Sequence, residues 1–251
     1  MFRQFADVVF TEDVVKDLPK AVYKDIEIEA TEEHRKIQEQ ISNTLAKSSK
    51  QELLKTYGQL MSMADVASVD LRMLSGADSD VNVFKDYSLE ELEHENSKIN
   101  TMCDIVLDEY KKSNNIKGTQ IIFCDKGSGS GTVYSFNLHK DIMQKLIDRG
   151  IPKDEIVIIK NQNDAQLEAL YEKVNEGEVR VIIGTSQKMA EGLNVQKRVV
   201  AIHHPTVTYK PSDWEQGNAR GVRSGNINKE VRIYRYLQKS TFDSHKWQAQ
   251  G

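Results

Sequence analysis

The chain has 251 residues, 39% of them hydrophobic, which is enough for one large domain or for a domain with an appendage. Its formal net charge of −4 argues by itself against a generic nucleic-acid binder. The sequence has no N-terminal secretory segment and no apolar run near the roughly 18 residues of a membrane span. Two cysteines, Cys103 and Cys124, give neither a disulfide framework nor a metal-ligand spacing, so we expect a cytoplasmic protein.

The charge is unevenly distributed along the chain. From Lys188 onward there are 11 Lys and Arg against 5 Asp and Glu, a local +6, which leaves −10 for residues 1–187. A basic C-terminal third is typical of a surface that faces phosphate. Chance clustering of charges on solvated faces is the alternative.

In chain order, residues 1–117 are predicted to form a mostly helical linker or appendage. Residues 1–30 mix short extended runs with Pro19, and residues 31–58 and 88–112 have helical spacing of apolar residues. Residues 118–251 alternate between patterns typical of strands and patterns typical of helices. Strands are expected near 119–124, 155–159, 179–183, 198–203 and 230–237, and helices near 134–148, 163–174, 187–191 and 213–223. This alternation predicts an α/β domain with a parallel, helix-covered sheet.

Two of the expected strands run into loops of small polar residues. Val179–Gly184 leads into Thr185–Gln196, and Thr119–Asp125 leads into Lys126–Thr132. Loops at the carboxyl ends of parallel strands are where α/β proteins place ligands, because backbone N–H groups and hydroxyls there can meet phosphate oxygens. The second loop lacks the spacing and the lysine of a phosphate-binding P-loop.

A polar stripe is predicted near the C-terminus. Gln216, Arg220 and Arg223 fall at i, i+4 and i+7, which would place all three on one face of a helix. An amide and two guanidinium groups are too costly to bury unpaired, so the stripe should face an anion such as phosphate. The alternative is a solvated helix with two surface arginines.

The same segment carries signals for its helix boundary and its packing. Ser212 or Asp213 is a plausible N-cap. Gly217 and Gly221 each cost about 1 kcal/mol of helix propensity relative to Ala, and they would let another surface approach closely.

Three segments in series resemble motifs IV, V and VI of superfamily-two helicases. They are Phe123–Asp125, Gly184–Val195, and Gln216-x3-Arg220-x2-Arg223-x-Gly225-Asn226. More narrowly, the chain resembles the second ATPase lobe of Swi/Snf-type DNA translocases, in the branch fused to DNA methyltransferases on phages and conjugative elements. Shorter matches support this resemblance, among them Asp70-Leu-Arg72, Ser97-Lys98 and Thr241-Phe-Asp243. The sequence departs from the pattern at Ala219 and Ser224.

The resemblance implies a RecA-like C-terminal helicase lobe and assigns roles to the arginines. Arg220 and Arg223 would reach the γ-phosphate of ATP across an interface between two lobes, and Gln216 would orient them or the attacking water. Gly192 and Asn194, together with Glu191, would lie near the nucleotide. A helix C-cap followed by a turn is the alternative for Gly192 and Asn194.

The resemblance also implies contacts with double-stranded DNA. Thr185, Ser186 and Lys188 would contact backbone phosphate. The alternative is that they are N-cap residues and a solvated lysine. His203-His204 invites a metal interpretation, but adjacent strand residues point to opposite faces and no third ligand has suitable spacing, so we expect no metal site there.

No Gly-x4-Gly-Lys-Ser/Thr loop occurs in the sequence. We therefore expect ATP and Mg²⁺ to be bound mainly by a first lobe that this chain does not include, and we expect the isolated chain to be inactive. The expected partners are duplex DNA, that N-terminal lobe and possibly a fused DNA methyltransferase. The alternative function is a non-catalytic nucleic-acid- or protein-binding module that keeps the helicase-lobe fold.

Overall fold

The computed structural model describes residues 18–77, 82–128, 136–160, 163–190, 192–207, 211–243 and 246. In this part of the chain, six parallel strands form one sheet in the order β1-β6-β5-β2-β4-β3. The strands are β1 (Lys20–Ile28), β2 (Thr119–Phe123), β3 (Ile156–Ile158), β4 (Val181–Gly184), β5 (Val199–His204) and β6 (Glu230–Gln238). The sequence therefore predicted the α/β class, and the five strands after residue 118, correctly.

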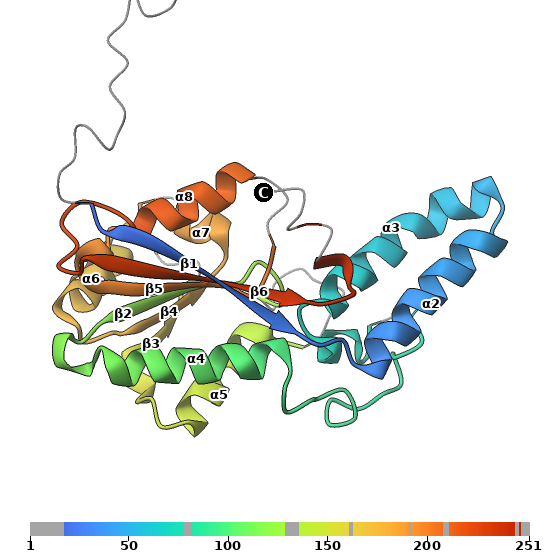
Figure 1. Ribbon diagram of the computed structural model, residues 1–251, viewed down its shortest axis with the longest axis horizontal. Coiled ribbons are helices and arrows are strands. Elements are labelled where there is room, and N and C mark those ends of the chain that lie inside the picture. Colours follow the sequence, from blue (N-terminus) through green and yellow to red (C-terminus); the bar gives the residue numbers. More distant parts are fainter. Residues whose placement is uncertain are drawn as a thin grey trace, which may run out of the picture.

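Helices cover both faces of this sheet (Figure 1). The longer ones are α2 (Glu32–Lys47), α3 (Lys50–Ala67), α4 (Lys98–Lys112), α5 (Leu138–Asp148), α6 (Asp164–Glu176) and α8 (Pro211–Gly221), and α7 (Ser186–Ala190) is short. Helices α4 and α5 lie on one face, and α6, α7 and α8 lie on the other. Short 3-10 turns are η2 (Leu71–Leu74), η3 (Asn114–Ile116), η4 (Lys153–Glu155) and η5 (Gln196–Arg198).

The sheet also takes elements from before residue 117. Strand β1 pairs with β6 from Lys20↔Glu230 to Ile28↔Gln238, and α4 packs against β2, β5 and β6. The helix expected over residues 31–58 is confirmed as α2 and α3, with a break at Ser48 and Ser49 and an extension to Ala67. The helix expected over residues 88–112 is wrong for residues 88–97, which form turns, because Ser97 caps the N-terminus of α4 and the helix begins at Lys98. The boundary at residue 117 stays a prediction, but the observed sheet joins segments from both sides of it.

Helices α2 and α3 form a hairpin that projects from the sheet (Figure 1). Ser49 begins α3 with a capping box, in which its backbone N–H donates to Glu52 Oε2 at 2.8 Å. The base of the hairpin is deeply packed, through Ile37 of α2 and Leu60, Met63 and Val66 of α3.

The turn η2 connects this hairpin to the helix layer below the sheet. Arg72 is 4% exposed and lies between two carboxylates, donating to Asp70 Oδ2 at 2.7 Å and to Asp141 Oδ2 at 2.7 Å. Because Asp141 belongs to α5, this buried ion pair fixes η2 against the sheet layer.

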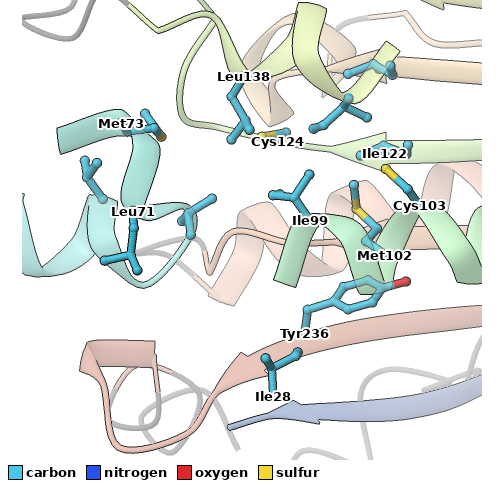
Figure 2. Packing of buried hydrophobic residues seen from close by; sticks show 14 of the residues in the cluster. Ile28, Leu71, Met73, Ile99, Met102, Cys103, Ile122, Cys124, Leu138 and Tyr236 are labelled. Carbon is cyan, nitrogen blue, oxygen red and sulfur yellow. The ribbon is translucent and has the colours of Figure 1, made fainter. Parts of the chain in front are cut away.

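The hydrophobic core has two parts, one on each face of the sheet. On the α4 face, Figure 2 shows Ile99, Met102 and Cys103 of α4 packed between Ile122 of β2 and Tyr236 of β6. Burial raises the pKa of both free thiols, Cys103 and Cys124, to about 12, so they are protonated near neutral pH. No helix in the described ranges is long and apolar enough to cross a membrane.

Candidate functional site

Helix α8 carries the predicted polar stripe, but its ends differ from the prediction. It begins at Pro211, so Ser212 and Asp213 lie in its first turn and the predicted N-cap is wrong. Proline suits the first turn of a helix because its missing N–H would have no helical partner there.

The helix ends at Gly221, two residues before Arg223. Gln216 and Arg220 share α8, whereas Arg223 lies in the bend that follows, so the prediction that all three lie on one helix is wrong for Arg223. Asn226 closes this bend, because its Nδ2 donates to the backbone oxygens of Gly221 at 3.2 Å and Val199 at 2.9 Å.

The two glycines of α8 face the sheet. A Cβ at Gly221 would lie 2.7 Å from Val199 Cγ1 and 2.9 Å from Ile202 Cδ1, and a Cβ at Gly217 would lie 3.4 Å from the Phe123 ring. The predicted close approach is confirmed, and the approaching surface is the chain's own sheet. Only at Gly221 would a Cβ be too close to β5, so the approach of the helix to this strand depends on that glycine.

A polar contact completes the attachment of α8. Asn218 is buried, and its Oδ1 lies 3.0 Å from His204 Nε2 at the end of β5. The His204 ring also stacks on Phe123 at 5.2 Å and packs on Trp214 at 4.1 Å. Burial lowers the pKa of His204 to about 3, so the imidazole is neutral and Nε2–H donates to Asn218.

The three residues of the predicted stripe differ in their exposure. Gln216 and Arg223 are exposed, and Arg220 is half-buried. The helix that Gly221 and Asn218 hold against the sheet therefore carries an exposed amide, Gln216, and a half-buried guanidinium, Arg220, with the exposed Arg223 just beyond its end.

The segment that resembles motif V begins at the end of β4. Thr185 Oγ1 accepts from the backbone N–H of Lys188 at 3.3 Å, and Ser186 donates to Asp125 from both its N–H, at 2.6 Å, and its hydroxyl, at 2.9 Å. Both hydroxyls thus have partners inside the chain, but only the Thr185 contact is the one that the N-cap alternative predicts, because Ser186 is the first residue of α7 and its hydroxyl donates to Asp125. Their contact with DNA stays a prediction.

Gly192 and Asn194 lie just after α7. Gly192 has φ +79°, lies two residues beyond the end of α7, and has open space around its Cα. This left-handed conformation is typical of a glycine that ends a helix. Asn194 is exposed, and its backbone oxygen accepts from Asn175 Nδ2 at 2.8 Å. Glu191 lies outside the described residues.

The carboxyl ends of β2, β4 and β5 meet at one edge, as the sequence predicts for its small-residue loops. Asp125 after β2 joins Ser186 after β4, and its N–H donates to Thr206 Oγ1 after β5 at 3.1 Å. Helices α7 and α8 are in contact beside this edge. Sequence patterns gave no signal for the role of Asp125 in bridging these strands.

The two histidines of β5 do point to opposite faces. His203 lies on the α4 face, with Nδ1 at 2.8 Å from the Tyr236 hydroxyl and Nε2 at 3.0 Å from Gln120 Oε1, whereas His204 lies against α8. Burial lowers the pKa of His203 to about 3. In the described part of the chain, no group of three or more His, Cys, Asp or Glu residues is arranged to hold a metal ion.

Acidic residues from the first 187 positions neutralise much of the basic C-terminal third. The ion pairs are Arg232–Glu109, Arg235–Asp25, Lys239–Glu29, Lys197–Glu176 and Lys246–Asp65. In the described part of the chain, these five basic residues therefore each lie beside an acidic side chain. Lys188, Arg220 and Arg223 lie among the residues of the candidate site.

The comparisons with known proteins support one conclusion about the fold. The structure is similar to the C-terminal part of the Fun30 ATPase domain, with a TM-score of 0.60, 13% identity, and coverage of 93% of this chain and 90% of that one. It is also similar to the Hef helicase domain of Pyrococcus furiosus, with a TM-score of 0.58, 14% identity, and coverage of 96% of this chain and 60% of that one. The chain has the RecA-like fold of a helicase lobe.

Sequence comparison adds one short match. No family model matches the chain. A stretch of 92 residues is 34% identical to the "Defense against restriction protein B" of Escherichia phage P1, which is 35% of this chain but only 4% of that protein. The chain thus spans a small fraction of the length of this phage relative.

Proposed function

We propose that this chain is the C-terminal motor lobe of an ATP-dependent DNA helicase or translocase of the Swi/Snf type. The observation that carries the proposal is the anchoring of α8, which is held against the sheet at Gly221 and Asn218. The helix and the bend that follows it carry Gln216, Arg220 and Arg223.

Arg220 and Arg223 would stabilise the negative charge that develops on the γ-phosphate during hydrolysis. A guanidinium supplied across a lobe interface contributes on the order of 10³–10⁵ in rate to such reactions, because it acts on charge that appears only in the transition state. The role requires a fixed helix with an accessible guanidinium, since a misplaced donor loses most of its effect. Gln216, one turn before Arg220, would orient the arginines or the attacking water.

The nucleotide would be shared between two lobes. ATP with Mg²⁺ would be held mainly by an N-terminal lobe that carries the phosphate loop, because this sequence has no such loop. Gly192, Asn194 and Glu191 would approach the nucleotide from the present lobe. The left-handed turn at Gly192 supports this, since it leaves the backbone open to solvent.

Thr185, Ser186 and Lys188 would contact the phosphate backbone of duplex DNA. Backbone contacts position a protein on DNA without selecting a sequence, which suits a motor that moves along it. For Ser186, such a contact would require an exchange of partner, because its hydroxyl donates to Asp125 in this structure.

The match with a phage protein supports a mobile-element setting for this lobe. The resemblance to the methyltransferase-fused branch extends the proposal to a native polypeptide that also carries the first lobe and a DNA methyltransferase. The two-lobed motor and the methyltransferase would then act on the same DNA molecule.

A non-catalytic nucleic-acid- or protein-binding module is the second candidate. Two observations favour it: the hydroxyls of Thr185 and Ser186 are bonded within the chain, and many C-terminal basic residues are paired with acids. Such a module would keep the helicase-lobe fold without contributing to hydrolysis.

The isolated chain provides the test. We expect no release of phosphate from ATP above background, with or without duplex DNA, because the phosphate cradle and the metal belong to the other lobe. We expect weak duplex binding that falls with salt and is equal for unrelated sequences. Phosphate release is measured alongside titration of labelled duplexes at two salt concentrations. Robust turnover, or affinity that does not change with salt, would contradict the proposal.

A further inference from the structure

A buried carboxylate on the helical hairpin is bound by two lysines from distant parts of the chain. Asp65 of α3 is 3% exposed, and its Oδ2 lies 2.7 Å from Lys126 Nζ. Its Oδ1 accepts from Lys246 Nζ. Lys126 follows β2, and Lys246 follows β6, so this ion triad connects α3 to two segments beyond the carboxyl ends of the strands.

The two lysines differ in their access to solvent. The side chain of Lys126 is 29% exposed, whereas that of Lys246 is 8% exposed and also donates to the backbone oxygen of Val207 at 3.4 Å. A buried carboxylate that loses its only counter-ion is strongly destabilised. Asp65 can release Lys126 and still keep Lys246 as its counter-ion.

The carboxylate remains ionised near neutral pH. Burial alone would raise the pKa of Asp65, but the ammonium groups of Lys126 and Lys246 bring it below its ordinary value. Asp65 and Lys126 are therefore held together by the attraction between two full charges. Another anion can compete with Asp65 for this lysine.

Lys126 lies at the edge where the strand ends meet. The preceding residue, Asp125, accepts from the N–H and the hydroxyl of Ser186 at the start of α7. Residues 125 and 126 thus connect β2 to α7 on one side and to α3 on the other. The segment that carries Lys126 therefore adjoins the start of α7, to which the proposed DNA-contact residue Ser186 belongs.

We propose that Asp65 and Lys126 form an exchangeable ion pair, in which a backbone phosphate of duplex DNA replaces Asp65 as the partner of Lys126 while Lys246 keeps Asp65 neutralised. The phosphate partner rests on the proposed function. Because Asp65 belongs to α3, the helical hairpin and the DNA backbone would compete for the same lysine, Lys126.

A second ion pair would hold the hairpin in place during the exchange. Asp243 and Lys98 are each 1% exposed and paired with one another, and Asp243 Oδ1 also accepts from the Ser68 hydroxyl at 2.9 Å. Ser68 directly follows α3. The exchange would therefore free Lys126 without detaching the base of the hairpin.

The first test measures duplex binding by the full chain over a range of salt concentrations. Lys126→Ala should weaken binding and reduce the slope of log affinity against log salt by about 1, the value for one lost phosphate contact. Lys197→Ala is the matched control, since Lys197 is also a lysine paired with a carboxylate, Glu176, but precedes β5 at the opposite edge. An unchanged slope in Lys126→Ala, with measurable binding by the parent chain, would overturn the proposal.

The double variant Asp65→Asn with Lys246→Met tests the competition itself. It removes the acid that competes for Lys126, together with the buried counter-ion of that acid, so duplex affinity should rise severalfold. Affinity equal to that of the parent chain would contradict competition by Asp65.

Thermal unfolding tests the ion triad without DNA. Lys126→Ala should lower the unfolding temperature by less than Lys246→Ala, because only the second variant removes the buried counter-ion of Asp65. An equal or larger loss in Lys126→Ala would refute the exchangeable pair. A parent chain that binds no duplex would instead contradict the proposed function, and the thermal comparison would still decide whether the pair can open.

Discussion

At the scale of single residues, His203 and His204 show how one dipeptide can serve both faces of a sheet. His203 bonds to Tyr236 and Gln120 on the α4 face. His204 bonds to Asn218 and so holds α8 on the other face. Burial is the main cause of the low pKa of about 3 for each ring. These histidines are structural residues, and their neutral form is the one that the fold requires.

This leads to a prediction for stability against pH. In the unfolded chain histidine titrates near pH 6.5, so between about pH 6.5 and pH 3 the unfolded state binds more protons than the folded state. The two neutral histidines therefore contribute their full stabilisation of the folded state above about pH 6.5. Below that pH the free energy of unfolding declines, by about 1.4 kcal/mol per pH unit for each histidine. Urea unfolding at a series of pH values measures this decline.

The variant His204→Gln provides the control for that measurement. It removes one titrating ring, so the decline in unfolding free energy between about pH 6.5 and pH 5 should be shallower than in the parent chain, whatever the absolute stability of the variant. A slope identical to that of the parent would show that His204 does not titrate with unfolding.

At the scale of elements, α8 depends on two glycines that make different contacts. A Cβ at Gly217 would meet the Phe123 ring at 3.4 Å, an ordinary van der Waals distance, whereas a Cβ at Gly221 would meet Val199 at 2.7 Å and Ile202 at 2.9 Å. The same substitution should therefore have opposite effects at the two positions.

We expect Gly217→Ala to raise the free energy of unfolding by up to about 1 kcal/mol, because alanine favours the helix and fits the space. We expect Gly221→Ala to lower it by about 1–3 kcal/mol, because the new methyl group overpacks the contact with β5. Denaturant unfolding of the two variants gives the comparison. Equal stabilisation by both would mean that α8 is not pressed against the sheet.

The sequence predicted the central strands because buried parallel strands are continuous apolar runs, as in Ile121–Phe123 and Val181–Ile183. It did not predict the full length of β1, whose residues Lys20–Ile28 alternate with charges because an edge strand is half exposed. The sequence predicted the polar residues of α8, but it wrongly placed Arg223 within the helix. The spacing of residues does not show where a helix ends, and here it ends before the bend that Asn226 closes.

The contacts that position the candidate site were not predictable from local pattern. His204 and Asn218, Asp125 and Ser186, and Asp65 and Lys126 each join residues that are distant in sequence. Hydrophobic period and motif spacing report neighbours along a helix or strand. They carry no information about which polar side chains from different elements meet in the folded chain.

At the scale of the whole molecule, the charge asymmetry of the chain has an internal explanation. Asp25 and Glu109 from the acidic part pair with Arg235 and Arg232 from the basic third. The parallel pairing of β1 with β6 brings Asp25 and Arg235 side by side, because they are directly opposite in the register. Under the proposed function, we therefore expect contacts with DNA to depend on residues near the carboxyl edge of the sheet, such as Lys188, rather than on these paired residues.

The central claim is that this lobe supplies arginines to an ATP site completed by another lobe. The most direct measurement is DNA-stimulated ATP hydrolysis by a protein that joins this lobe to its native first lobe, with Arg220→Ala and Arg223→Ala made separately. We predict that each variant hydrolyses ATP about 10³–10⁵-fold more slowly while duplex affinity changes little, because the guanidinium acts on transition-state charge. Replacement of either arginine by lysine should restore little of the hydrolysis rate, since an ammonium lacks the planar fork of donors. Hydrolysis at the parental rate in both alanine variants would contradict the account and favour the binding-module function.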